Sequence, residues 1–160
     1  MYVIQTKTGC EKETAAALEA KGYDIRVPEK MMNIRRQGRF IYQQYLIFSG
    51  YIFMNADDIP PDVYYDVKNT AGVINFLGRG KPTPLTETEK RYINILWNGG
   101  MPILPSKVYK TVTGALMVMS GILKKYPMEI VKADIRHKRA KVEIPICGTI
   151  KKITLPIEVL

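Results

Sequence analysis

Residues 47–54 read Ile-Phe-Ser-Gly-Tyr-Ile-Phe-Met, a run of apolar and aromatic residues interrupted by Ser49 and Gly50. Gly50 permits a sharp bend, and the residues after it alternate between the two faces of a β-strand. Tyr51 and Phe53 share one face, and Ile52 and Met54 share the other. One set fills a core, which leaves the other as a candidate exposed apolar patch for a partner. The alternative, in which helices cover both faces, stays open at this point.

The segments on either side predict alternating strands and helices. Residues 2–5 form a short apolar strand, and the spacing Thr8-x-x-Glu11 is that of a capping box that begins a helix, which Gly22 ends. Residues 25–32 and 39–54 are strand-rich and flank a basic turn. The second of these is too long for one strand, and we expect an interruption before Leu46.

The next fifty residues continue the alternation. Pro60 and Pro61 open a helix over 62–68, and residues 73–77 form another apolar strand. A second capping box begins at Thr86 and precedes an apolar helical stripe, which glycines at 99 and 100 end. This order predicts an α+β domain with an antiparallel sheet flanked by helices.

The C-terminal third has a different pattern. From Val108 onward no helical period appears, and short β-rich runs occur at 116–119, 129–133, 140–146 and 150–155, separated by glycine and proline. This pattern is typical of a small β-barrel. We therefore expect domains at 1–98 and 108–160, joined by a linker at 99–107.

Charge is unevenly distributed along the chain. The formal net charge is +9, and residues 101–160 carry 11 Lys and Arg against 4 Asp and Glu. Such runs are often simply solvated, but five cations within ten residues of an already basic domain favour RNA or DNA as the partner. The candidate nucleic-acid-binding residues are Lys124, Lys125, Lys132, Arg136, His137, Lys138, Arg139 and Lys141.

No constellation of residues indicates an enzyme. The single histidine, His137, lies in a basic run, and the cysteines Cys10 and Cys147 are too far apart for metal-ligand or redox spacing. We expect no catalytic residue, no metal and no cofactor. No apolar stretch is long enough to span a bilayer and no secretory signal is visible, so we expect a cytoplasmic monomer without a membrane partner.

In order along the chain, several segments resemble the NusG family of transcription factors. Residues 2–5 and 8–11 are similar to the opening strand and helix of the family. The segments at 48–53 and 72–78 are similar to two later strands, with Ser49 at a position where proline is usual. The resemblance implies a NusG-type N-terminal domain and a C-terminal β-barrel of the KOW type.

The resemblance also implies a mechanism without bond chemistry. The N-terminal domain would bind the clamp helices of the RNA polymerase β′ subunit, reach the β subunit and thereby disfavour pausing and termination. Lys7 matches a loop position that approaches non-template DNA in related factors. The residues that match the polymerase-binding surface are Phe48, Gly50, Tyr51 and Phe53.

The C-terminal domain resembles that of a specialised branch of the family. No phenylalanine follows Phe76, whereas general members have an acidic-Gly-Pro-Phe turn for partner docking. The basic hairpin is similar to that of LoaP, a processive antiterminator, which implies binding to an RNA hairpin in the nascent transcript. The alternatives are a general NusG-type factor that couples polymerase to the ribosome or a termination factor, and a ribosomal or structural RNA-binding protein.

Overall fold

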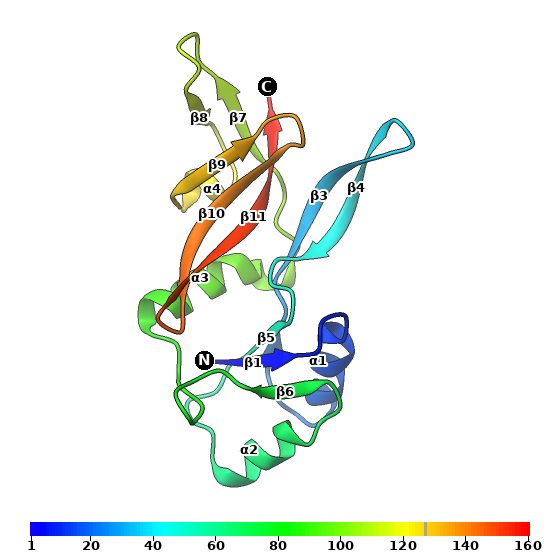
Figure 1. Ribbon diagram of the computed structural model, residues 1–160, viewed down its shortest axis with the longest axis vertical. Helices are drawn as coiled ribbons and strands as arrows, with labels where there is room; N and C mark the ends of the chain where they lie inside the picture. Colours follow the sequence, from blue (N-terminus) through cyan, green and yellow to red (C-terminus); the bar gives the residue numbers. More distant parts are fainter. Residues whose placement is uncertain (127) are drawn as a thin grey trace. The chain divides into compact units, whose positions relative to one another are not determined.

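The computed structural model describes residues 1–126 and 128–160, which form two compact units (Figure 1). The first unit comprises residues 1–28, 48–100 and 146–149. The second comprises residues 29–47, 101–145 and 150–160. Nothing in the sequence indicates that residues 29–47 group with the C-terminal segments. The domain limits of 1–98 and 108–160 remain a prediction.

The first unit is built on a four-stranded antiparallel sheet in the order β2-β5-β1-β6. Its strands are β1 (Tyr2–Thr6), β2 (Ile25–Arg26), β5 (Tyr51–Met54) and β6 (Val73–Phe76). Its helices are α1 (Glu11–Ala20), α2 (Pro61–Lys68) and α3 (Glu87–Trp97), followed by the short 3₁₀ helix η1 (Asn98–Gly100). The expected α+β class with an antiparallel sheet is confirmed.

One face of this sheet carries a large apolar cluster of the first unit. Ile4 pairs with Ile52 across β1 and β5, and both side chains are fully buried. Leu18 of α1 and Val67 of α2 are buried in the same apolar cluster. Burying each such aliphatic side chain contributes roughly 1.5–3 kcal/mol, so this face supplies much of the stability of the unit.

The two predicted capping boxes have different outcomes. At α3 the prediction is confirmed, because Glu89 N donates to Thr86 Oγ1 at 3.2 Å and Thr86 N donates to Glu89 Oε1 at 2.9 Å. At α1 it is wrong, because Cys10 is the N-cap residue and its side chain makes no capping bond. The carboxylate that would complete the box, Glu11, is used elsewhere.

Glu11 stabilises the loop that leads into β5. Its side chain is buried, and its two oxygens accept hydrogen bonds from the backbone N–H groups of Gly9 and Gly50, the latter at 3.4 Å. Gly50 has a φ of 80°, a left-handed conformation that favours glycine. Glu11 therefore helps to hold the bend that the sequence places before Tyr51.

We expect Glu11→Ala to lower the free energy of unfolding by about 1–3 kcal/mol, because it leaves the buried N–H of Gly50 without an acceptor. Urea-induced unfolding of the full chain measures the change. Glu13→Ala is the matched control, since Glu13 lies on the same helix and is exposed. Equal stabilities for the two variants would contradict this role.

Two strand boundaries differ from the sequence expectation. The run 25–32 divides at Val27 and Pro28 into β2 and β3 (Glu29–Arg36), since proline supplies no N–H for pairing. The break in 39–54 comes after Leu46, not before it, because β4 (Arg39–Leu46) pairs with β3 along its whole length. The β3–β4 turn uses Gln37 and Gly38, both with positive φ, as a tight hairpin turn requires.

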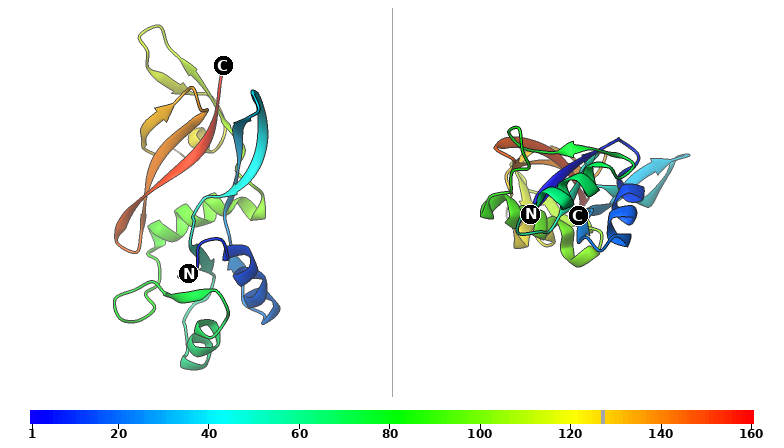
Figure 2. Two further views of the ribbon diagram at one scale, coloured as in Figure 1. Left: turned by 45° about the vertical axis from the view of Figure 1, so that its right-hand side comes forward. Right: turned by 90° about the horizontal axis from the view of Figure 1, so that it is seen from below.

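The second unit combines this β3–β4 hairpin with a five-stranded sheet in the order β8-β7-β11-β10-β9 (Figure 2). The strands are β7 (Ser106–Lys110), β8 (Leu116–Val118), β9 (Ile130–Asp134), β10 (Arg139–Ile146) and β11 (Thr149–Val159). β7 and β11 pair in parallel. The β-rich character expected of this region is confirmed.

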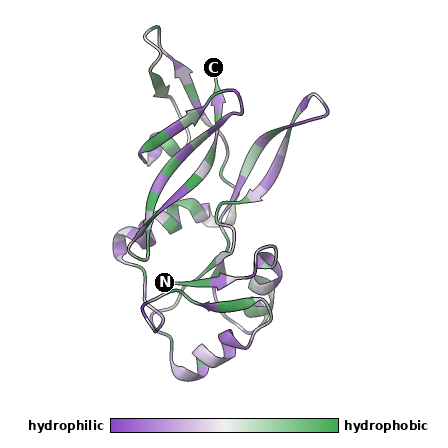
Figure 3. Ribbon diagram, in the orientation of Figure 1, coloured by the Kyte–Doolittle hydropathy of each residue, from purple (hydrophilic) through white to green (hydrophobic). Residues whose placement is uncertain are grey.

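Alternation along β10 shows why this segment forms a strand. Ala140, Val142 and Ile144 are fully buried, while Lys141 between Ala140 and Val142 is exposed. Figure 3 shows the accompanying alternation of hydrophobic and hydrophilic residues along β10. This period of two places one face in the core and the other in solvent. The candidate cations of β10 are therefore displayed on an outer face.

Part of the expected linker at 99–107 is ordered against β3. Ile103 is buried, its N–H donates to Glu29 O at 2.9 Å, and its carbonyl accepts from Met31 N at 2.8 Å. β7 then begins at Ser106. Apolar burial and backbone pairing hold Ile103 in place despite the two prolines that surround it.

Candidate functional site

The outer face of β9 and β10 carries the candidate cations of the basic hairpin. Lys132 lies directly opposite Lys141 in the strand register, and both are exposed. Like charges directly opposite one another destabilise a sheet. Repulsion between the two lysines therefore destabilises the free protein, and a bound polyanion would relieve it. Arg139, two pairs further toward the turn, is opposite Asp134.

The turn between β9 and β10 is stabilised by Asp134. Its Oδ1 accepts from His137 N at 3.0 Å, and its Oδ2 lies 2.8 Å from His137 Nδ1. The hydrogen bonds from the backbone and ring of His137 lower the pKa of the Asp134 carboxyl. His137, predicted to face nucleic acid, thus uses Nδ1 within the turn while most of its ring stays exposed.

One aromatic side chain of the β3–β4 hairpin, Phe40, lies beside the candidate cation Lys138. The Lys138 ammonium is 4.1 Å from the centroid of the Phe40 ring, and the Arg35 guanidinium is 5.9 Å from it. Phe40 remains 46% exposed, which is unusual for phenylalanine in a protein of this size. Cations and an exposed aromatic ring together are features of single-strand nucleic-acid surfaces.

A cavity of about 350 Å³ opens between these elements. It is here called the Phe40 cavity, and it brings together predicted and unpredicted residues. Its lining consists of Asn33, Ile34, Arg35, Phe40, Arg136, His137 and Arg139. Sequence reasoning identified Arg136, His137 and Arg139, whereas it interpreted the basic run at 35–38 only as a turn.

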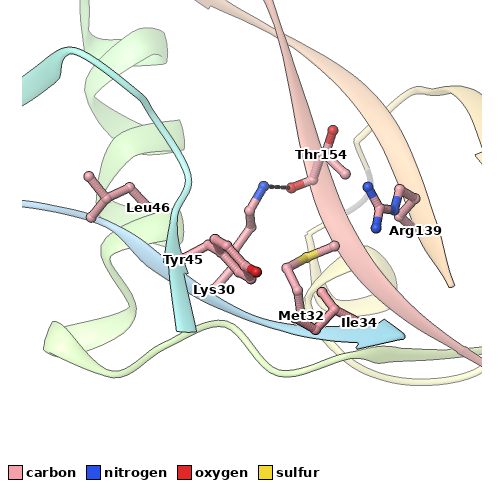
Figure 4. Close-up of a pocket in the computed structure, with 7 residues that line it drawn as sticks. All are labelled: Lys30, Met32, Ile34, Tyr45, Leu46, Arg139 and Thr154. Carbon is pink, nitrogen blue, oxygen red and sulfur yellow. Dashed lines mark hydrogen bonds between the residues drawn. The ribbon is translucent and has the colours of Figure 1, made fainter. Parts of the chain in front are cut away.

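A second cavity of about 320 Å³, here called the Lys30 cavity, adjoins the first and shares Ile34 and Arg139 with it (Figure 4). Figure 4 shows Lys30 reaching from β3 to β11, where its Nζ donates to Thr154 O at 2.8 Å. Its lining, which contains no carboxylate, consists of Lys30, Met32, Ile34, Tyr45, Leu46, Arg139 and Thr154.

Burial and the nearby Arg139 lower the pKa of the Lys30 ammonium from its ordinary value of 10.5 to about 8. At neutral pH Lys30 is therefore still charged in the folded protein, where its ammonium is less stable than in the unfolded chain. The charged Lys30 therefore lowers the free energy of unfolding. This effect is fully present below pH 8 and disappears as the pH rises toward 10.5, because Lys30 loses its proton at lower pH in the folded protein than in the unfolded chain.

We expect Lys30→Met to raise the free energy of unfolding by about 1 kcal/mol at pH 7, after the lost hydrogen bond to Thr154 and the partial exposure of Lys30 are subtracted. The gain should shrink at pH 10, and RNA affinity should fall. Thermal unfolding at both pH values and an RNA titration measure these effects. A variant that is destabilised at pH 7 and binds RNA as tightly as the parent would show that Lys30 serves only the fold.

Lys124 and Lys125 occupy a different setting from the one expected. They end a four-residue helix, α4 (Ile122–Lys125), instead of lying at the tip of a turn. Leu123 is buried and anchors this helix, so the adjacent lysines are directed outward and are exposed. Neither lysine lines the Phe40 cavity or the Lys30 cavity.

The candidate polymerase-binding residues in the first unit differ in exposure. Phe48 and Phe53 are 2% and 0% exposed, and their rings pack edge-to-face with centroids 5.1 Å apart. The expectation that Phe53 shares an exposed patch with Tyr51 is therefore wrong. Tyr51 is half-buried, and Gly50 O accepts from Thr6 N at 2.9 Å. Phe48 and Phe53 support this surface from within.

Lys7 lies in the loop between β1 and α1. It is exposed, and its backbone N–H donates to Gly72 O at 2.9 Å, which fixes the loop beside the start of β6. The geometry leaves its ammonium accessible to a polyanion, and contact with DNA stays a prediction.

A family model described as "Transcription termination factor nusG" matches residues 1–94. The chain belongs to the NusG family. Those residues contain the whole antiparallel sheet of the first unit and most of α3. The family resemblance deduced from the opening strand and the segment around Gly50 is confirmed.

Curated relatives of the NusG family extend the match into the C-terminal region. The transcription termination/antitermination protein NusG of a Synechocystis strain is 26% identical over 92% of this chain and 81% of its own length. The protein of the same name from Bacillus subtilis is also 26% identical, over 92% of this chain and 89% of its own length. The protein of the same name from Chlamydia pneumoniae is 32% identical over 58% of this chain and 55% of its own length.

The described part of the chain contains free thiols but no cluster of metal-ligating residues. No group of three or more His, Cys, Asp and Glu residues there could hold a metal ion. Both cysteines are free thiols, and burial together with Glu89 raises the pKa of Cys147. Among the described residues, no helix is long and apolar enough to cross a bilayer.

Proposed function

We propose that this protein is an elongation and antitermination factor that binds RNA polymerase through its N-terminal domain and nascent RNA through a basic KOW domain. Family membership supports a role in transcription termination or antitermination. The single observation that carries the RNA-binding part is the display of exposed lysines on β9 and β10, with Lys132 directly opposite Lys141. The protein thereby suppresses pausing and termination.

The basic surface explains how RNA would be held. Lys132, Arg136 and Lys141 are exposed, and among the described residues none has a carboxylate within 4.0 Å. By neutralising phosphates of an RNA stem, these side chains would release the cations that are condensed on the RNA. Arginine also hydrogen-bonds base edges through its planar guanidinium, so Arg136 and Arg139 would add sequence preference.

The first unit supplies the polymerase contact in this proposal. The surface around Gly50 and Tyr51 would bind the β′ clamp helices, and contact with the β subunit would bridge the cleft. A factor that binds the closed, elongating state more tightly than the paused state shifts the population toward elongation. Lys7 would lie toward the non-template DNA strand.

Within the family, the basic hairpin supports assignment to the specialised, LoaP-like branch. The chain has no phenylalanine after Phe76, so the docking turn expected of a general factor is missing from its sequence. Recruitment would then depend on a hairpin in the transcript, and the protein would act on particular operons.

Transcription in vitro tests the proposal. With purified bacterial polymerase and a template that encodes a stem-loop upstream of a terminator, the full chain should increase read-through. Lys132→Glu combined with Lys141→Glu should remove dependence on the stem-loop but preserve co-elution with polymerase. Read-through that is unchanged by deleting the stem-loop would contradict RNA-directed recruitment.

A further inference from the structure

We propose that the Phe40 cavity receives one unpaired nucleobase of the bound RNA. This inference rests on the proposed RNA-binding function and specifies its ligand, a base that has left the helical stack. The β9–β10 cations alone would bind any polyanion. The Phe40 cavity adds groups that recognise a base: an exposed aromatic ring, guanidinium groups and a buried hydrogen-bond acceptor.

The ring and the guanidinium groups provide stacking surfaces. Phe40 on β4 is 46% exposed, and Arg35, Arg136 and Arg139 line the same cavity. Bases stack on aromatic rings and on guanidinium planes regardless of their sequence. The Lys138 ammonium that now lies over the Phe40 ring would move to a phosphate when a base takes its place.

The buried acceptor belongs to Asn33. This residue is only 8% exposed, it lines the Phe40 cavity, and its Oδ1 accepts no hydrogen bond from any described residue. A buried acceptor without a donor is destabilising, and such an exception indicates a missing partner. Every unpaired nucleobase offers an N–H donor on its Watson–Crick edge, whereas a paired base has already used that donor.

The volume and the surroundings of the cavity fit this ligand. About 350 Å³ lies at the lower end of the range for small-molecule sites, which suits a single base and excludes a duplex. The adjoining Lys30 cavity, with Lys30 and the shared Arg139, would hold the neighbouring phosphate. A base and its phosphate therefore find complementary groups in adjacent positions.

Fluorescence-anisotropy titration of the full chain tests the proposal. The probes are a cytidine RNA octamer, an octamer of equal charge made of abasic residues, and a blunt RNA duplex of eight base pairs. We expect the cytidine octamer to bind about ten-fold more tightly than the abasic one, as stacking of one base would produce. Phe40→Ala should abolish this preference, and Phe40→Tyr should retain it.

Two further variants separate a specific role from a structural one. Asn33→Leu should reduce the preference for the cytidine octamer several-fold while binding to the duplex is unchanged. Tyr65→Ala is the matched control, because Tyr65 is an exposed aromatic residue on α2 of the other unit. Phe40 is itself exposed, so its replacement should leave the thermal midpoint unchanged.

The outcomes distinguish this proposal from the function on which it rests. Equal affinity for all three probes, unaffected by Phe40→Ala, would overturn the base-binding cavity and leave phosphate-directed RNA binding intact. Failure of every probe to bind would overturn both. A Phe40→Ala variant that loses polymerase but binds the probes normally would assign the cavity to a protein contact and also overturn the proposal.

Discussion

Phe53→Ala should lower the free energy of unfolding of the first unit by roughly 3–5 kcal/mol, whereas Tyr51→Ala should leave the fold intact and weaken polymerase binding. The difference arises from burial. Phe53 is fully buried against Phe48 and pairs with Val3 across the sheet, so its removal leaves a cavity. Tyr51 is half-buried on the same strand. Urea unfolding and co-elution with polymerase measure the two effects.

Tyr51→Phe is the control for polymerase binding, since it retains the ring and removes only the hydroxyl. We expect it to co-elute nearly as well as the parent protein. If Tyr51→Ala binds polymerase normally, the surface around Gly50 is not the contact. If Phe53→Ala unfolds at the same urea concentration as the parent, the packing with Phe48 does not stabilise the unit.

Neutralising four cations of the basic hairpin, through Lys132→Gln, Arg136→Gln, Arg139→Gln and Lys141→Gln, should nearly eliminate RNA binding at physiological salt. If about five phosphates are neutralised in the parent, log K plotted against log salt should have a slope of roughly −3.5 to −4.5. Removing four contacts should flatten that slope by about 3. Titration of the full chain with an RNA hairpin at three salt concentrations measures this change.

The matched control is Lys124→Gln with Lys125→Gln, because these lysines are exposed but line neither cavity. We expect their loss to flatten the slope modestly and to leave sequence preference unchanged. A quadruple variant with the parental slope would place the RNA elsewhere on the protein. The quadruple variant should also remain folded, since removal of the Lys132–Lys141 repulsion is stabilising.

Local chemistry made part of this fold predictable. The capping box at Thr86 and Glu89, the helix stop at Gly22 and the alternation in β10 each depend on residues close in sequence, and each is observed. The family could also be deduced, since short segments of the first unit retain a recognisable order. These features depend on backbone propensity and periodicity, which act over a few residues.

Other features depend on residues distant in sequence. The carboxylate of Glu11 accepts a hydrogen bond from the backbone N–H of Gly50 instead of completing the predicted capping box with Thr8. Phe53 is buried, although the alternation along its strand left either face possible for the core. Whether a strand face is covered depends on what packs against it, and that information is not contained in the strand. The same reason explains why the predicted exposed patch was wrong.

The sequence by itself determined the antiparallel α+β unit, the strand-rich C-terminal region and the concentration of cations near its end. Only the tertiary structure placed Phe40, Asn33 and Lys30 beside Arg139, across about a hundred residues of chain. An exposed ring, an acceptor without a donor and a desolvated ammonium are properties of an environment, not of a residue type. They appear only when distant segments have packed together.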